Sequence, residues 1–305
     1  MESFGQGGGK MKGELKMNFS KAVTEFEKLM QKLRVRNILY RTILRGRGVE
    51  FDSYREFGFD DDASMIDWSA SLRANQLLSR TYVEERNLNV YFLVDVGNSM
   101  LFGSRDKLKA EYSAELVAAL SHLILNAGDR IGLVMFGSGL SKVLYPSSKK
   151  TQFGLFMKFL KDSSLYGGGF DLNEAVDIVL RSSKSHYTVC VILSDFINLN
   201  SSNRRPLKLL GTRFETIAFM VRDYFDNHLP DTNYQFALQD PYSKKQLVLD
   251  PSIAIKRFRA KVLERKKFIK EVLGEANIDM LELNTEKPFI IPTAAFLMSR
   301  VGRKI

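Results

Sequence analysis

A run of β-branched, aromatic and aliphatic residues over 90–94 ends at Asp95, and small polar residues follow it. This pattern is typical of a buried parallel strand that leads through a loop into a helix, which we expect over 104–127. Asp95, Asn98 and Ser99 would then stand at the carboxyl end of the strand, where open α/β sheets keep their sites. An aspartate that only caps the following helix would give the same pattern, so this segment leaves both interpretations open.

Strand and helix patterns alternate along the rest of the chain. The spacing of apolar residues predicts strands over 131–136, 140–145, 188–193, 214–221 and 278–283, a hairpin over 236–249, and helices over 151–161, 171–181, 252–274 and 293–300. Such alternation predicts an α/β fold with a doubly wound, mostly parallel sheet and right-handed crossovers. The strand over 188–193 also leads into an acid, Asp195. If the two strands are neighbours, Asp95, Asp195 and Ser99 converge at one sheet edge.

The N-terminal quarter has a different character. The Gly-rich start predicts a flexible tail over 1–16, and apolar spacing predicts a helix over 20–44. An irregular arm is expected over 46–73, and an edge strand over 76–84. We therefore expect three parts: the tail over 1–16, the helix and arm over 17–75, and the α/β domain over 76–305.

The arm is dense in acids, which could suggest a catalytic cluster. Asp60, Asp61, Asp62 and Asp67 surround the single tryptophan, Trp68. Aspartates packed into one short segment are more often turn and capping residues, so we interpret them as structural and expect the aromatic residues to pack the arm on the sheet.

Composition narrows the class of protein. No apolar run approaches the roughly 18 residues of a membrane span, and the N-terminus lacks a secretory pattern, so a cytoplasmic protein is expected. The single cysteine, Cys190, lies within an apolar run and is expected to be a buried structural thiol. The net charge is +10, and basic residues are concentrated in two clusters, over 28–47 and 256–270. The two basic clusters are either solvated helix faces or contacts for an acidic partner, an acidic membrane or nucleic acid.

Several segments together carry a family resemblance. They are GRGVEF at 46–51, IDW at 66–68, DVGNSM at 95–100, DRIGLVMF at 129–136, LSDF at 193–196 and DPYSKKQLVLD at 240–250. On these segments the chain resembles the domain of unknown function 58 family, within the von Willebrand factor A-like group. The resemblance implies a von Willebrand factor A-like, Rossmann-type domain and a MoxR-type AAA+ ATPase as partner.

The resemblance also implies a metal-ion-dependent adhesion site, which holds Mg²⁺ through a D-x-S-x-S loop, a Thr and a further Asp. Asp95, Ser99 and Asp195 match this pattern as metal ligands. Gly97 replaces the middle Ser, and Phe170 replaces the Thr. Because Mg²⁺ requires near-ideal octahedral oxygen ligation, we expect weak Mg²⁺ binding or none, with water, Asn98 or Asp171 as the available substitutes.

The function that follows is a non-enzymatic interaction module with no catalytic residues. We expect an adaptor that works with a MoxR-type AAA+ ATPase in the assembly or maturation of client proteins. Its expected partner-binding residues lie at the strand ends: Asp95, Asn98, Ser99, Phe170, Asp171 and Asp195. Two alternatives stay open, a metal-dependent hydrolase of phosphate-containing substrates and a basic nucleic-acid-binding protein.

Overall fold

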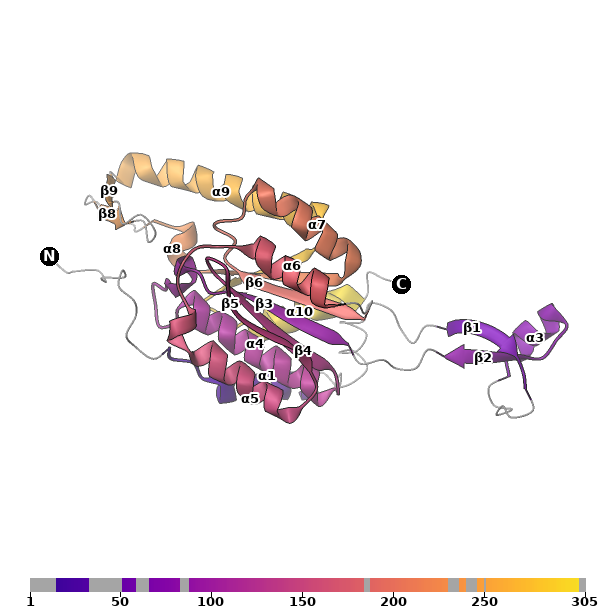
Figure 1. Cartoon of the computed structure of the whole chain (residues 1–305). Helices are drawn as coiled ribbons and strands as arrows, with labels where there is room; N and C mark the ends of the chain where they lie inside the picture. Colours follow the sequence, from indigo (N-terminus) through magenta and orange to yellow (C-terminus); the bar gives the residue numbers. More distant parts are fainter. Residues whose placement is uncertain are drawn as a thin grey trace.

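The computed structural model describes residues 15–32, 51–58, 66–82, 88–183, 187–229, 236–239, 246–249 and 251–301. Its centre is a six-stranded sheet in the order β10-β7-β6-β3-β4-β5 (Figure 1). The strands are β3 (Asn89–Asp95), β4 (Arg130–Phe136), β5 (Leu140–Ser147), β6 (Thr188–Ser194), β7 (Glu215–Arg222) and β10 (Asp279–Asn284). All neighbouring strands are parallel except β4 and β5. The predicted doubly wound, mostly parallel sheet is therefore confirmed.

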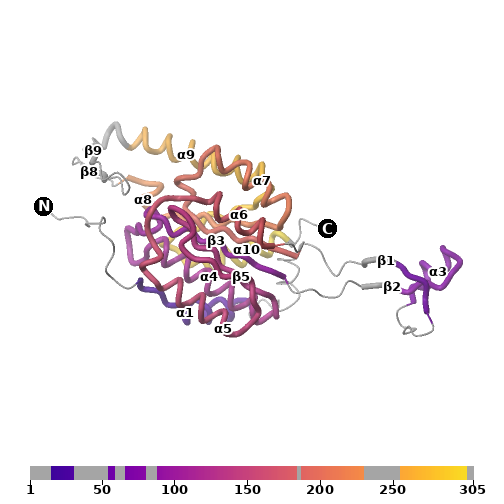
Figure 2. Tube along the Cα trace, viewed as in Figure 1, coloured from indigo at the N-terminus to yellow at the C-terminus, as the bar shows by residue number. Residues whose placement is uncertain are grey.

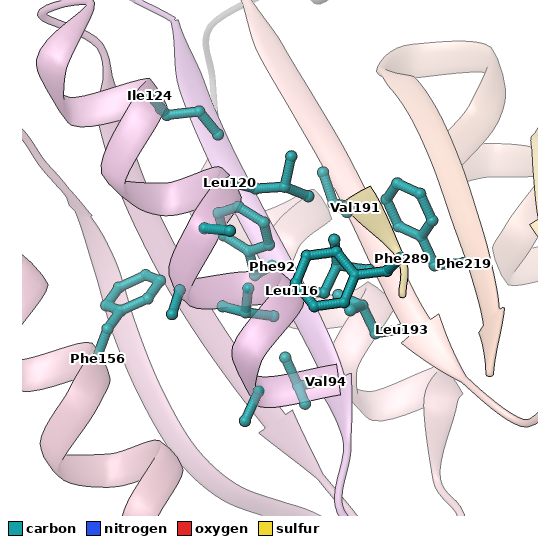
Figure 3. Close-up of a cluster of buried hydrophobic side chains, with 14 of the residues drawn as sticks. Phe92, Val94, Leu116, Leu120, Ile124, Phe156, Val191, Leu193, Phe219 and Phe289 are labelled. Atoms are coloured by element: carbon teal, nitrogen blue, oxygen red, sulfur yellow. The ribbon is translucent and has the colours of Figure 1, made fainter. Parts of the chain in front are cut away.

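Helices cover both faces of this sheet. One layer is formed by α1 (Phe19–Lys32), α4 (Lys109–Asn126), α5 (Lys150–Lys161) and α10 (Ile290–Val301), and the other by α6 (Leu172–Ser182), α7 (Arg204–Arg213) and α9 (Pro251–Glu275). Successive strand residues alternate between the two layers. Phe92 packs in the first cluster, edge to face with Phe156 (Figure 3). Tyr91 and Leu93 belong to the second cluster.

Most of the predicted elements are present, with shifted ends. The helix expected from residue 104 begins only at Lys109, because a short 3-10 turn, η2 (Asn98–Leu101), follows β3 and the Glu111 carboxylate caps α4 by accepting from Leu108 N at 2.9 Å. The sequence pattern did not predict α7. Only Leu207 and Leu210 of this helix are buried, which is too few to give a helical period.

The C-terminal hairpin follows the prediction, whereas a short helix before it was not predicted. After β7 comes the single-turn helix α8 (Tyr224–Asn227), and β8 (Phe236–Gln239) pairs antiparallel with β9 (Gln246–Leu249) as the expected hairpin. Cys190 is a free, buried residue of β6, which confirms its structural role. None of the helices in the described part of the chain combines the length and apolar character that a membrane span requires.

The arm contains more regular structure than expected. β1 (Phe51–Glu56) pairs antiparallel with β2 (Leu78–Tyr82), and α3 (Trp68–Ala74) lies between them in sequence. The expected edge strand over 76–84 is wrong as an edge of the central sheet, because β2 belongs to this separate pair (Figure 2). We call β1, β2 and α3 together the arm unit.

Of the aspartates around Trp68, the structure describes Asp67. Asp67 caps α3 by accepting from Ala70 N at 3.0 Å, and it also accepts from the Tyr54 hydroxyl. This supports the interpretation of Asp67 as structural, whereas the residues at 60–62 lie outside the described residues. Trp68 is 65% exposed, so the expectation that it packs the arm on the sheet is wrong.

The close crossing of α7 and α9 gives a test of the packing. A Cβ added at Gly211 in α7 would lie 1.9 Å from the Ala276 carbonyl oxygen, whereas one added at Gly154 in α5 would meet nothing within 4 Å. We expect Gly211→Ala to lower the free energy of unfolding by about 1–3 kcal/mol, since backbone must shift to admit the methyl group.

Gly154→Ala is the matched control. It should raise the free energy of unfolding by about 1 kcal/mol, because alanine is the better helix former at an unobstructed position. Both values are obtained from urea unfolding curves. Equal effects of the two substitutions would contradict the close crossing.

Candidate functional site

The two strand-end aspartates lie side by side at the carboxyl edge of the sheet. β3 and β6 are parallel neighbours in a register that pairs Val94 with Leu193. The Asp95 carboxylate accepts a hydrogen bond from the Ser194 hydroxyl at 2.5 Å and another from Gly97 N at 2.8 Å. Asp95 and its neighbour Asp195 are both fully buried. The predicted convergence of the two carboxylates is therefore confirmed.

A buried lysine that the sequence analysis did not identify completes the centre of the site. Lys109, the first residue of α4, is 1% exposed, and its Nζ donates to Asp195 Oδ2 at 2.8 Å and to Asp226 Oδ2 at 3.0 Å. The other Asp195 oxygen, Oδ1, accepts from Ile197 N at 3.0 Å. Asp195 is thus held by an ammonium on one side and by its own loop on the other.

The sequence did contain a signal for Lys109. A cation in the first turn of a helix opposes the helix dipole, so it is unfavourable there unless a nearby anion compensates for it. Lys109 also begins a helix whose next residues, from Ala110 to Ser121, are all buried. A lysine at such a position is expected to have an ion-pair partner, but the sequence does not say which acid it is.

A fourth aspartate connects further loops to this edge. The buried Asp223 carboxylate follows β7 and caps α8, accepting from Phe225 N at 3.0 Å. It also accepts from Ser104 N at 2.9 Å and from the Thr285 hydroxyl at 3.3 Å. The loops after β3, β7 and β10 therefore meet at one carboxylate, and they form a single connected edge.

The two central aspartates have opposite electrostatic environments. Burial, together with the negative charge of Asp195, raises the pKa of Asp95 to about 7, despite the hydrogen bond from Ser194. Burial also acts to raise the pKa of Asp195, but the adjacent Lys109 ammonium outweighs it and lowers that pKa. The site therefore pairs a carboxyl that readily holds a proton with one that stays ionised.

The other predicted site residues mainly join loops. Asn98 accepts from Gly168 N at 3.1 Å through its side chain, and its own backbone N donates to the Gly168 carbonyl. Phe170 is half-buried and packs edge to face on Phe136, with 5.7 Å between ring centroids. Asp171 caps α6 by accepting from Glu174 N at 3.1 Å.

Ser99 has a buried position at the same edge. It lies in η2, directly after the strand-end loop, with 6% of its surface exposed. The structure thus brings Asp95, Asn98, Ser99, Phe170 and Asp195 to one edge, while the Asp171 carboxylate serves the next helix.

These residues do not fit the octahedral oxygen shell of Mg²⁺. Both Asp95 oxygens and both Asp195 oxygens already accept hydrogen bonds or an ion pair within the protein. Gly97 and Phe170 offer no side-chain oxygen, and a Cβ at Gly97 would lie 2.4 Å from the Gly169 carbonyl oxygen. Among the described residues no group of three or more His, Cys, Asp or Glu is arranged to hold a metal. Weak or absent Mg²⁺ binding stays a prediction.

Two apolar side chains are exposed directly beside the buried ion pair. Phe102 is 44% exposed, and its ring centroid lies 5.8 Å from Lys109 Nζ. Ile197 is 36% exposed, and its own backbone N donates to Asp195. We call the surface formed by Asn98, Phe102, Phe170 and Ile197 the strand-end face.

The raised pKa of Asp95 leads to a pH-dependent stability. In the unfolded chain this carboxyl titrates near about pH 4, so the folded state binds its proton more tightly. The bound proton therefore stabilises the folded state below about pH 4. As the pH rises to about 7, the free energy of unfolding falls by up to about 4 kcal/mol. Asp95→Asn removes this titration. As the pH is raised from about 5 to about 8, we expect its free energy of unfolding in urea to rise by about 2–3 kcal/mol relative to that of wild type.

Asp195→Asn is the control with the opposite sign. It leaves Lys109 partly unpaired, so near about pH 5, where Asp195 is ionised, it should be destabilised by about 3–5 kcal/mol. Near about pH 8 the loss should be smaller, because the Asp195 charge that opposes ionisation of Asp95 is then absent. An Asp95→Asn effect that does not change with pH would contradict the raised pKa.

Comparison with known proteins agrees with this architecture. Residues 53–268 match the family described as "Protein of unknown function DUF58". The "uncharacterized protein Rv1480" of Mycobacterium tuberculosis and the "uncharacterized protein Mb1516" of Mycobacterium bovis are each 26% identical over 262 residues, which cover 85% of this chain and 81% of theirs.

Solved structures with a similar core have low sequence identity. The conserved hypothetical protein BatB from Bacteroides thetaiotaomicron aligns with a TM-score of 0.47 and 12% identity, over 72% of this chain and 98% of that one. The SpRpn10 VWA domain aligns with a TM-score of 0.36 and 12% identity, over 72% of this chain and 95% of that one. The chain, with its mostly parallel sheet and single antiparallel edge strand, belongs to the DUF58 family.

Proposed function

We propose that this chain is a non-enzymatic protein-interaction module and that the strand-end face is its docking surface. The observation that carries the proposal is the exposure of Phe102 and Ile197 beside a fully buried ion pair. Large apolar side chains fixed at the rim of a rigid polar edge resemble the anchors that dominate protein interfaces. Because their backbone is already held in place, little conformational entropy is lost when a partner binds.

The buried members of the predicted site would act as supports for this surface. Asp95, Ser99 and Asp195 are too buried to contact a partner directly. Asp195 holds the loop that presents Ile197, and Asp95 holds the Gly97 turn. Direct contact would then fall to Asn98, Phe102, Phe170 and Ile197.

The proposed partner is a MoxR-type AAA+ ATPase or its client protein. This identity rests on the family resemblance, and the surface chemistry is compatible with it, since a partly apolar, partly polar patch suits a reversible protein contact. The adaptor would work in the assembly or maturation of the client. A hydrolase of phosphate-containing substrates has less support, because the strand-end carboxylates already accept from donors within the protein.

A pull-down of the cognate ATPase tests the docking surface. We expect Phe102→Asp and Ile197→Asp to lower capture by at least about tenfold, because each places a charge in the centre of the proposed interface. Leu209→Asp is the matched control: Leu209 is also a large exposed residue, but it lies on α7 rather than on the strand-end face. Circular dichroism should show that all three variants are folded.

A second pair of variants separates the adaptor from a nucleic-acid binder. Lys267 and Lys270 are exposed on α9, so Lys267→Glu and Lys270→Glu should leave ATPase capture nearly unchanged. If these variants abolish capture while folded Phe102→Asp and Ile197→Asp retain it, the basic helix is the interface and the proposal fails. Nucleic-acid binding through α9 would appear as affinity that falls steeply with salt.

A further inference from the structure

The Lys109 side chain is one of the least exposed charged groups of the molecule. It is 1% exposed, and desolvation of an ammonium is costly unless close anions compensate for it. Its Nζ lies 2.8 Å from an Asp195 oxygen, and both Asp226 oxygens lie within hydrogen-bonding distance, at 3.0 and 3.2 Å. An ammonium donates three hydrogen bonds, and these acceptors use its donors. Lys109 therefore joins the buried Asp195 carboxylate to the Asp226 carboxylate, whose side chain is 9% exposed.

The segments that Lys109 joins are far apart in the sequence. Asp195 directly follows β6, Asp226 lies in α8 after β7, and Lys109 opens α4 after the β3 loop. Three separate connections at the carboxyl edge are thus held by one positive charge. A divalent ion at the end of such a sheet would have to take its ligands from these same connections.

We propose that the Lys109 ammonium is the resident cation of this edge and occupies the place at Asp195 that a divalent ion would otherwise need. The family resemblance implies a Mg²⁺ site at Asp95, Ser99 and Asp195, at which we expected weak binding or none. Two further ligand positions of that site, Gly97 and Phe170, have no side-chain oxygen, and Asp195 already has a cation.

The loop packing closes the site further. The Cβ of any larger residue at position 97 would lie 2.4 Å from the carbonyl oxygen of Gly169, which is too close for a real contact. A serine at position 97 could not supply a hydroxyl unless the 167–169 loop moved. The loop is held in place, since Gly169 N donates to the Ser138 hydroxyl at 2.5 Å and Gly167 N donates to the Val96 carbonyl at 2.7 Å.

An internal cation has a direct consequence for the strand-end face. The Lys109 charge fixes Asp195, which holds the Ile197 backbone, and Lys109 N itself donates to the Phe102 carbonyl at 3.0 Å. Both exposed residues are therefore tied to Lys109, Ile197 through the ammonium and Asp195, and Phe102 through the backbone amide. The face should keep its shape when divalent ions are removed, whichever partner binds to it.

The first test uses the purified full chain and Mn²⁺ alone, followed by electron paramagnetic resonance and by thermal unfolding. We expect no saturable uptake up to about 1 mM Mn²⁺, the weak end of protein sites for divalent ions, and no rise in the Tm. Saturable uptake in wild type that disappears in Asp195→Asn would overturn the proposal. Uptake that persists in Asp195→Asn comes from acids elsewhere and leaves Lys109 as the cation of the edge.

The second test replaces the charge. Lys109→Met keeps most of the side-chain volume but removes the ammonium, so its Tm should fall by about 10 °C. In Lys109→Ala, propylammonium matches the deleted atoms and should restore much of the lost Tm, whereas 1-propanol, which has nearly the same volume but no charge, should not.

A Lys109→Met variant as stable as wild type would overturn the proposal, and so would equal rescue of Lys109→Ala by propanol and propylammonium. If neither variant folds, the Mn²⁺ titration of wild type and Asp195→Asn still decides the question. These tests need no partner, so their failure is distinguishable from a failure of the proposed docking function.

Discussion

A buried carboxylate must be neutralised by a proton, a cation or several hydrogen bonds, and the carboxyl edge of this sheet depends on that constraint. Asp195 and Asp226 meet it by sharing the Lys109 ammonium. Asp95 meets it differently, with hydrogen bonds from Ser194 and Gly97 and a raised pKa. The result is an edge in which strand ends, helix starts and loops are fixed to one another by charge rather than by apolar packing alone.

The exposed side chains of this edge owe their positions to the backbone around it. Phe196 has a left-handed φ of 52°, which is uncommon for a bulky residue and costs on the order of 1–3 kcal/mol. Its amide donates to the Ser194 hydroxyl and its carbonyl accepts from Arg265, so the surroundings enforce the turn. The turn buries the Phe196 ring and leaves Ile197 outside. A strained residue, compensated by hydrogen bonds, thus decides which apolar side chain a partner would meet.

Local patterns predicted the sheet well because apolar runs that end in acids are local features. They placed Asp95 and Asp195 at strand ends, and the shared edge of parallel strands made their convergence predictable. Lys109 was not predicted, because its two partners lie 86 and 117 residues away and a lysine is normally assigned to the surface. For the same reason the strand at 78–82 was recognised but not its partner, since a strand pattern carries no information on which distant strand pairs with it.

The helix that precedes the arm unit belongs structurally to the core. Phe26 of α1 is fully buried against α4, and Asn18 N donates to the Glu115 carboxylate at 2.9 Å. The arm unit is therefore an insertion between two core elements, α1 and β3, rather than an N-terminal appendage. The family match begins at residue 53, so a chain that started there would keep most of the arm unit but lose a helix of the core and expose the α4 surface beneath it. Removing the arm cleanly would instead require an internal deletion that leaves α1 joined to the sheet.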